Sequence, residues 1–208
     1  STLKLLDIAS RNGDRLLMLV NDILDAQALS DGRVSTERNP VNLNEIVATA
    51  VENCNVYAEQ LGVAYCVTTE NEKVVALTDS ARVTQVLFNL LSNAAKFTSS
   101  GDVVKVNVKR NKQMARIEII DKGIGISAEQ QDNVFSPFHQ INPGISSGIK
   151  SSGLGLSITK QLMDLLGGKI GVSSNEGEGS MFWIELDLVP AEHDSRKFSP
   201  VLLISGSN

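Results

Sequence analysis

The chain has 208 residues, of which 42% are hydrophobic and 21% are charged, a composition typical of a globular domain. Nineteen basic and twenty-four acidic residues give a net charge of -5, which argues against binding to the phosphate backbone of nucleic acids. The two cysteines, Cys54 and Cys66, lack zinc-site spacing. No apolar run approaches the roughly 20 residues of a membrane helix, so we expect a cytoplasmic fragment without membrane contact, which leaves open an inner-membrane anchor elsewhere in a full-length protein.

The first segment predicts an amphipathic helix whose apolar side has no partner nearby in the sequence. Between positions 3 and 28, apolar residues recur at spacings of three and four, namely Leu5, Ile8, Leu16, Leu19, Val20, Ile23 and Leu24. Nothing else in the first forty residues can cover this stripe, so we expect a neighbouring helix or a second copy of the chain to do so. A helix folded back on the following domain is the alternative. The segment SDGRVSTERNP then ends the helix and indicates a domain boundary.

The central region predicts two helices and four strands. One helix is capped by Asn42 or Asn44 and stops at Gly62, and the next opens at Asp79 or Ser80. The strands are expected at VAYCVTT, VVALTD, VVKVNVK and ARIEIID, and the last two alternate with the period of half-buried strands.

The last third of the chain predicts a loop, a helix and a hairpin. Residues from Ser136 to Ser152 are rich in Ser and Gly without periodicity, which is typical of a functional lid. LGLSITKQLMDLLGG then predicts a helix ending at Gly167 or Gly168, and GKIGVSS and SMFWIELDLV predict a hairpin. Together these elements predict an α/β fold with helices on one face of a mixed sheet.

Three polar groups share one face of the second central helix. Asn89, Asn93 and Lys96 stand at positions i, i+4 and i+7, with leucines on the opposite side. Amide oxygens can ligate a hard cation, and a lysine can contact phosphate. Because such residues are common on helix surfaces, this spacing by itself favours a solvated face.

Two glycine motifs follow. In DKGIGIS, Asp121 ends a predicted strand and can accept a hydrogen bond from an exocyclic amine, while Gly123 and Gly125 allow close approach of a ring. In SSGLGLSI, Gly153 and Gly155 open a helix whose N-terminal amides suit a phosphate. Tight turns use glycines in the same way, so either motif by itself is weak evidence.

The order of the motifs is more specific than any one of them. NLLSNAAKF, DKGIGI, VFSPF and SGLGL resemble the N box, first glycine box, F box and second glycine box of sensor histidine kinases, over roughly residues 42–189. This resemblance implies the Bergerat ATP-binding fold of gyrase-type, chaperone-type and mismatch-repair ATPases. That fold is a two-layer α/β sandwich with a mixed sheet and an ATP lid.

The resemblance also implies ATP and Mg2+ as ligands and gives residues their roles. Asp121 would bind the adenine amine, Asn93 and Asn89 would hold the metal, and Lys96 would contact phosphate. The pocket would be completed by Gly123, Gly125, Gly153, Leu154, Gly155 and Ser180, the serine standing where the family usually has threonine. Phe135 and Phe138 would flank the lid, and simple apolar packing is the other interpretation of them.

The resemblance favours a kinase over a hydrolase. Hydrolytic relatives have a glutamate in place of Asn89, and an amide cannot deprotonate water, whereas a neutral histidine acceptor is already nucleophilic. Neither His139 nor His193 fits the acceptor position, so we expect the chain to bind Mg-ATP without phosphorylating a histidine of its own. The alternative is a kinase-like regulatory module that acts by dimerisation without turnover, and the intact ATP motifs count against it.

Three parts of the chain are expected from the same resemblance. Residues 1–35 resemble the second helix of the dimerisation and phosphotransfer hairpin, which implies a homodimer in the full-length protein. Residues 40–190 would be the ATP-binding catalytic domain. Residues 191–208 would be a linker and the first strand of a receiver domain, degenerate because Ser205, Gly206 and Ser207 occupy the place of its acidic pair. A receiver domain or a response regulator is the expected partner.

Overall fold

The computed structural model describes residues 13, 20, 23–24, 27–29, 31–70, 72–139 and 153–189. The described positions between Gly13 and Leu29 are helical, and Val20, Ile23 and Leu24 expose 45%, 51% and 59% of their surface. The predicted apolar stripe is therefore uncovered where it is described. The predictions for most of the lid and for the C-terminal segment fall on residues outside the described ranges.

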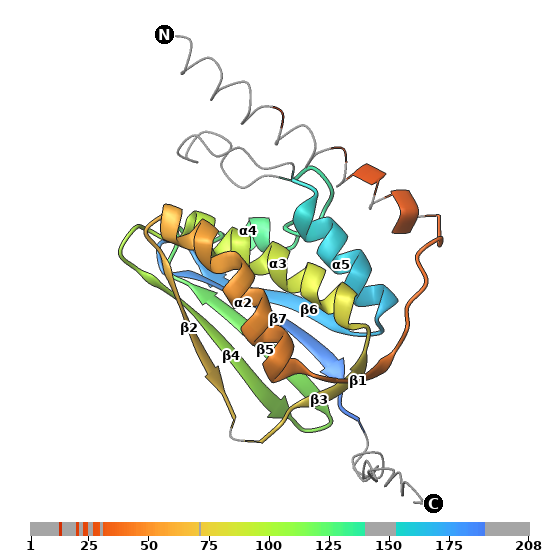
Figure 1. The fold of residues 1–208 in the computed structure, drawn as a ribbon. Helices are drawn as coiled ribbons and strands as arrows, with labels where there is room; N and C mark the ends of the chain where they lie inside the picture. Colours follow the sequence, from red (N-terminus) through yellow and green to blue (C-terminus); the bar gives the residue numbers. More distant parts are fainter. Residues whose placement is uncertain are drawn as a thin grey trace, which may run out of the picture.

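Five strands form one mixed sheet in the order β2-β4-β5-β7-β6 (Figure 1). Their bounds are Ala64–Thr69 for β2, Val103–Asn111 for β4, Met114–Asp121 for β5, Lys169–Asn175 for β6 and Gly179–Asp187 for β7. Strand β2 runs parallel to β4, and the other neighbouring pairs are antiparallel. Alternate residues of β4 and β5, among them Val106 and Ile117, are buried on one side of the sheet, as half-buried strands require.

Three helices cover that side of the sheet (Figure 1). They are α2 (Leu43–Gln60), α3 (Ser80–Phe97) and α5 (Gly155–Leu165). The side-chain oxygens of Asn42 and Asp79 accept hydrogen bonds from backbone N–H groups in the first turns of α2 and α3, so these helices begin at the predicted caps. The predicted α/β fold, with helices on one face of a mixed sheet, is confirmed. In the described part of the chain, none of the helices has the length and apolar character needed to cross a membrane.

A second, two-stranded sheet joins the two ends of the domain. Strand β1 (Asn39–Asn42) pairs antiparallel with β3 (Val75–Thr78). Immediately after β7, Leu188 forms a bridge with Ala76, and Val189 N donates to Val75 O at 3.0 Å. The chain therefore enters and leaves the domain on the two edges of β3, an arrangement that we call the entry-exit strap.

Strand β1 is not anticipated by the sequence pattern, which indicates only a boundary there. Pro40 lies within β1, and proline is tolerated because β1 is the edge of its small sheet. Two contacts continue from this segment to the helices: Arg38 Nη2 donates to Leu165 O at 3.1 Å, and Glu37 N donates to Asp79 Oδ2 at 3.1 Å.

Candidate ATP site

Helix α3 carries Asn89, Asn93 and Lys96 on one face, and all three residues are half-buried. The rest of the helix is fixed in the core by Val83, Val86, Leu87, Leu90, Leu91, Ala94 and Ala95. Because these apolar side chains determine how α3 is rotated, its polar face is held in place before any ligand is bound.

The amide group of Asn89 joins α3 to the start of α5. Its Nδ2 donates to Gly155 O at 3.3 Å and to Thr159 Oγ1 at 3.4 Å. Gly155 O can only accept, and Thr159 Oγ1 already donates its own proton to Gly155 O at 2.8 Å, so both partners need the nitrogen. The orientation of the amide is therefore set, and Asn89 Oδ1 accepts no hydrogen bond from the residues that the structure describes, so it can accept from or ligate a bound group.

Lys96 is an ammonium group for which no ion pair is found among the described residues. Its Nζ lies 5.1 Å from the centroid of the Phe97 ring. Burial lowers the pKa of Lys96, because removal from water disfavours the charged form. The side chain of Asn93 makes no hydrogen bond to the part of the chain that the structure describes. The ammonium of Lys96 and the side-chain amide of Asn93 are therefore both available to contact a ligand.

Asp121 is a buried carboxylate at the end of β5, with 5% of its surface exposed. Its Oδ1 accepts from Gly123 N at 2.8 Å and from Ser180 N at 3.2 Å. Burial raises the pKa of Asp121, and the two backbone hydrogen bonds oppose that rise without cancelling it. Within the described ranges, every hydrogen bond to this carboxylate goes to Oδ1, so Oδ2 remains available as an acceptor.

The glycines after Asp121 are required by close backbone contacts. A Cβ on Gly123 would lie 2.5 Å from Phe97 O, at the C-terminus of α3. Gly125 has a φ of +70°, and a Cβ there would overlap Asn175 O at the end of β6. The loop that follows β5 is therefore packed directly against both α3 and β6.

The second glycine motif leads into α5 and meets the first helix of the site. Gly153 O accepts from Phe138 N at 2.9 Å, which brings the F-x-P-F segment to this point. Leu154 is buried, with 4% of its surface exposed. A Cβ on Gly155 would lie 3.5 Å from Asn89 Oδ1, an ordinary contact distance, so this glycine is near the amide without being sterically required there.

The two phenylalanines of the F-x-P-F segment have different surroundings. Phe135 packs edge-to-face against Phe182, with ring centroids 6.4 Å apart, and is partly buried against the core. Phe138 has a φ of 61° and exposes 71% of its surface. Apolar packing, one of the two interpretations of these residues, holds for Phe135.

The arrangement brings together all the polar motifs that the sequence singles out. The N-box helix contacts the second glycine motif through Asn89, and it contacts the first glycine motif through Phe97 and Gly123.

The family profile described as histidine kinase-, DNA gyrase B-, and HSP90-like ATPase matches residues 78–190, more than half of the chain. The chain belongs to this ATPase family.

Curated relatives show which members of the ATPase family this chain resembles. The autoinducer 2 sensor kinase/phosphatase LuxQ of Vibrio parahaemolyticus is 32% identical over 203 residues, which cover 94% of this chain and 23% of the relative. The sensor histidine kinase RcsC of Escherichia coli is 31% identical over 196 residues, which cover 93% of this chain and 20% of the relative. The chain thus spans about a fifth of the length of these relatives.

The solved structures similar to this chain include histidine kinases, as the curated relatives do. Full-length ShkA in complex with AMPPNP matches with a TM-score of 0.77 and 28% identity, over 87% of this chain and 37% of that one. The histidine kinase ThkA in complex with the response regulator protein TrrA matches with a TM-score of 0.72 and 28% identity, over 90% of this chain and 51% of that one. The chain is therefore the ATP-binding catalytic domain of a sensor histidine kinase.

The ATPase domain contains supporting residues that the sequence does not single out. Ser174 Oγ accepts from Ile126 N at 2.9 Å, and Gln131, at the end of the short helix α4 (Ala128–Gln131), donates to Ile126 O and Ser174 O at 2.9 Å each. Thr159 supports Asn89, as described above. The alternation of the predicted hairpin places Ser174 on the same inner face as Ser180, so this pattern could have indicated Ser174 as a neighbour of the site. No comparable pattern indicates Gln131.

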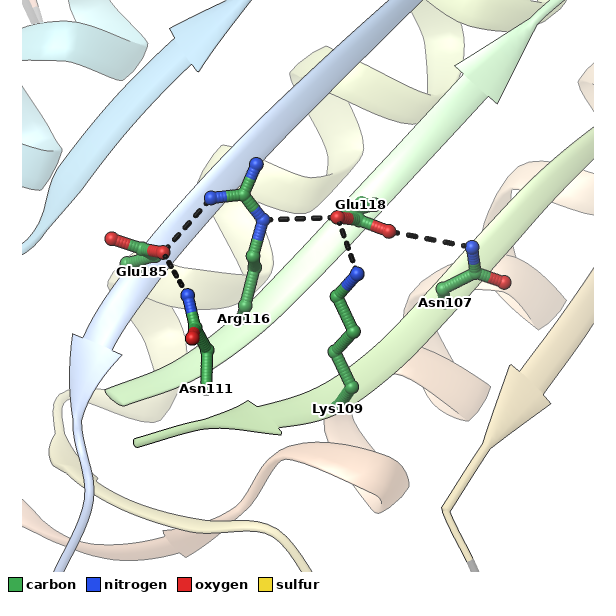
Figure 2. Close-up of polar contacts among 6 residues, drawn as sticks. All are labelled: Asn107, Lys109, Asn111, Arg116, Glu118 and Glu185. Carbon is green, nitrogen blue, oxygen red and sulfur yellow. Dashed lines mark hydrogen bonds and ion pairs between the residues drawn. The ribbon is translucent and has the colours of Figure 1, made fainter. Parts of the chain in front are cut away.

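The outer face of the sheet carries a separate charged network (Figure 2). Arg116 contacts Glu118 at 3.0 Å and Glu185 at 2.9 Å, and Lys109 contacts Glu118 at 2.8 Å. Two amides, Asn107 and Asn111, donate to the same carboxylates. The guanidinium also lies 4.3 Å above the ring of Trp183.

The two glutamates of this network are charged despite their burial. Glu118 is 6% exposed and Glu185 is 9% exposed. Burial by itself raises the pKa of each, but hydrogen bonds from Lys109, Arg116 and the two amides outweigh it, so both pKa values lie below the usual range. The charges of the network compensate one another, and the network lies on the opposite side of the sheet from Asp121.

Proposed function

We propose that this domain binds ATP with Mg2+ and transfers the γ-phosphate to a histidine of the dimerisation hairpin in a sensor kinase. The supporting observation is the set orientation of Asn89. Its amide oxygen has no partner in the described part of the chain, so it can ligate a hard cation, but an amide cannot remove a proton from water. The site therefore favours phosphoryl transfer to an acceptor that needs no deprotonation over ATP hydrolysis.

Asp121 is assigned to the adenine base. Its Oδ1 is engaged by two backbone donors, and its Oδ2 would accept from the exocyclic amine of adenine. The rise in the pKa of Asp121 reflects a buried charge without a counter-ion among the described residues, which is typical of a binding site. Gly123 and Gly125 would line the ring, and Ser180 would add a hydroxyl beside the carboxylate.

Asn89 and Asn93 are assigned to Mg2+. Among the described residues there is no group of three or more His, Cys, Asp or Glu side chains that could hold a metal. Mg2+ fits this donor set, because it commonly uses one or two protein oxygens together with phosphate oxygens and water. When bound, the metal neutralises charge on the phosphates.

Lys96 and the start of α5 are assigned to the phosphates. The half-buried ammonium of Lys96 has no competing carboxylate within the described structure, and the backbone N–H groups after Gly153, Leu154 and Gly155 lie at a helix N-terminus. The transfer breaks the bond between the γ-phosphorus and its bridging oxygen and forms a bond to the histidine nitrogen, with ADP as the leaving group. The protein's part is to position the phosphate and to stabilise its charge.

Two partners follow from the same proposal. The exposed Val20, Ile23 and Leu24 support dimerisation through the N-terminal helix in the full-length protein, because an apolar helix stripe needs a cover. A response regulator or receiver domain would then take the phosphoryl group, as the complex of the structural neighbour ThkA with the response regulator TrrA supports.

The proposal is tested by binding first and by phosphotransfer second. A fluorescent ATP analogue should bind to the chain more tightly with Mg2+ than without it, and Asn89→Ala should remove most of that dependence. Asn107→Ala, an equal change on the outer face, is the control and should behave like the wild type. In the full-length protein, γ-labelled ATP should label a histidine. Release of free phosphate without a labelled histidine would refute the kinase assignment.

A further inference from the structure

The side-chain hydroxyl of Ser174 on β6 is saturated by three partners. Its oxygen lies 2.7 Å from Gly179 O, 2.9 Å from Ile126 N and 3.0 Å from Ser180 Oγ. A serine hydroxyl has one proton to donate and two lone pairs to accept with. These three contacts therefore use its entire hydrogen-bonding capacity.

The chemistry of the partners determines the direction of each hydrogen bond. Gly179 O can only accept, so the Ser174 proton is directed to it, and the Ile126 N–H can only donate. The remaining contact, between Ser174 Oγ and Ser180 Oγ, must then use the proton of Ser180. Ser180 Oγ consequently keeps both lone pairs and has no proton left for a ligand.

Ser174 is itself held in place from a second side. Gln131 Nε2 donates at 2.9 Å both to Ile126 O and to Ser174 O, so the loop and β6 are joined by one amide as well as by the hydroxyl. Ser174 is also directly opposite Ser180 in the β6–β7 pairing. The geometry that directs the Ser180 proton is thus built into the sheet and the loop.

The directed hydroxyl lies next to the carboxylate assigned to adenine. Ser180 is paired with Asp121 in the register of β5 and β7, and Ser180 N donates to Asp121 Oδ1 at 3.2 Å. Ser180 is 8% exposed and Asp121 is 5% exposed. Asp121 and Ser180 are therefore buried neighbours across β5 and β7, and each keeps an oxygen that can accept, Asp121 Oδ2 and Ser180 Oγ.

We propose that Ser174 is a positioning residue that fixes the Ser180 hydroxyl as an acceptor and thereby helps the site to select adenine over a 6-oxopurine. This inference rests on the proposed ATP site at Asp121. Adenine carries an amine at position 6, which donates, whereas hypoxanthine carries a carbonyl there, which accepts. Neighbouring acceptors suit the amine and disfavour the carbonyl. A Ser180 proton that was free to rotate could donate to the carbonyl and would weaken the selection.

The test compares the Kd values of Mg-ATP and Mg-ITP, by displacement of a fluorescent ATP analogue from the chain. In Ser174→Ala the Ser180 proton is released, and the ratio of the ITP Kd to the ATP Kd should fall about fivefold, the value of one hydrogen bond. Ser174→Thr keeps a hydroxyl and should retain the wild-type ratio. Ser173→Ala, an exposed neighbour on β6, is the matched control and should also retain it.

A double mutant separates positioning from general loosening of the site. In a Ser180→Ala background, Ser174→Ala should lower the ratio no further, because the hydroxyl through which Ser174 acts is gone. A folded Ser174→Ala protein with the wild-type ratio would overturn the inference, as would an equal fall in both backgrounds.

Two further measurements keep the inference testable. If Ser174→Ala does not fold, Ser180→Ala by itself must lower the ratio, and an unchanged ratio would overturn the inference. Wild-type protein that binds neither nucleotide would instead refute the ATP site itself. The two proposals therefore fail in distinguishable ways.

Discussion

Two buried carboxylates on the same strand have opposite electrostatic surroundings. Asp121 and Glu118 are 5% and 6% exposed, and their odd separation in sequence places them on opposite faces of β5. The pKa of Asp121 is raised by burial, whereas Lys109, Arg116 and an amide bring that of Glu118 below the usual range. Their exposed fractions are similar, but Asp121 lies deeper in the protein and Glu118 has counter-ions beside it, so the two pKa values shift in opposite directions.

The difference in pKa shift distinguishes Glu118, whose charge is paired within the protein, from Asp121, whose charge has no such partner in the described structure. On the outer face, the guanidinium of Arg116 and the ammonium of Lys109 are paired with carboxylates of the protein and have little left to offer a ligand. On the inner side, the carboxylate of Asp121 is buried and the ammonium of Lys96 is half-buried, and neither has such a partner in the described structure, which leaves each group available for binding. Variants on the two faces should therefore change different measured quantities.

The largest effect is expected from Asp121→Asn. Because Gly123 N and Ser180 N donate to the atom at the Oδ1 position, the new amide would place its NH2 group where Oδ2 stands, facing the adenine amine with a donor. ATP affinity should fall about a hundredfold, as expected when a hydrogen bond to a charged group is lost. The free energy of unfolding should stay the same or rise by about 1 kcal/mol, because a buried charge is removed. Calorimetric titration and urea unfolding measure the two.

The matched change on the outer face is Glu118→Gln. It should lower the free energy of unfolding by about 1–2 kcal/mol, through loss of the contacts with Lys109 and Arg116, and leave ATP affinity within twofold of wild type. Similar losses of ATP affinity in both variants would show that the two faces are not independent.

On the outer face, a larger loss of stability than that of Glu118→Gln is expected from Arg116→Met. The change leaves Glu118 and Glu185 buried without the guanidinium they share, and should lower the free energy of unfolding by about 2–3 kcal/mol. Lys109 still compensates Glu118, which keeps the loss below that of a fully unpaired charge. Arg116→Lys should recover part of the stability in urea unfolding, with ATP affinity unchanged throughout. Full stability of Arg116→Met would mean that the network contributes nothing.

Two lysine variants, one on each side of the sheet, test the same difference with smaller expected effects. Lys96→Met should reduce ATP affinity about tenfold by removing a phosphate contact, without lowering stability, because the half-buried ammonium costs free energy in the unliganded protein. Lys109→Met should lower the free energy of unfolding by less than about 1 kcal/mol, since the side chain is 43% exposed, and should not change ATP affinity. The reverse pattern would contradict the assignment of Lys96 to phosphate.

The smallest effect is the pH dependence of stability. The folded-state pKa of Asp121 lies above the unfolded value of about 3.9, so the folded protein takes up that proton first as the pH falls. The stability of the wild type should therefore rise relative to Asp121→Asn on acidification, and the difference between them should close.

The pH dependence of stability that comes from Glu118 has the opposite sign. Its folded-state pKa lies below the unfolded value of about 4.3, so the stability it contributes is fully present above that value and is lost as the pH falls through the folded-state pKa. The advantage of the wild type over Glu118→Gln should thus disappear in acid. Urea unfolding across a pH series checks both signs, and parallel curves for the two variants would contradict the contrast between the faces.

The sequence predicts the parts of the site that depend on local periodicity. The spacing of Asn89, Asn93 and Lys96 defines one face of a helix whatever its neighbours are, and the strand before Asp121 alternates clearly. The helix caps Asn42 and Asp79 are also local signals, and both are found. These features depend on residues within about one turn or one strand of each other, so they are visible without the tertiary fold.

Features that depend on pairing between distant segments are not visible in this way. The network of Arg116 with Glu185 joins residues 69 positions apart, and the sequence does not reveal the register of β5 and β7 that places them together. The same holds for Gln131, whose amide contacts a residue 43 positions away, and for β1, whose only partner is β3. A short strand with a proline also has too few residues to show a period.

The entry-exit strap has a mechanical consequence for the ATPase domain. Ser180 stands at the beginning of β7 and Asp121 at the end of the antiparallel β5, whereas Leu188 and Val189 contact β3 just beyond the far end of β7. The entry-exit strap therefore lies at the opposite end of β5 and β7 from Asp121 and Ser180. Figure 1 shows β1 and β3 beside that end of the sheet. A rotation of the domain about the entry-exit strap would therefore displace Asp121 and Ser180 more than the residues of β3.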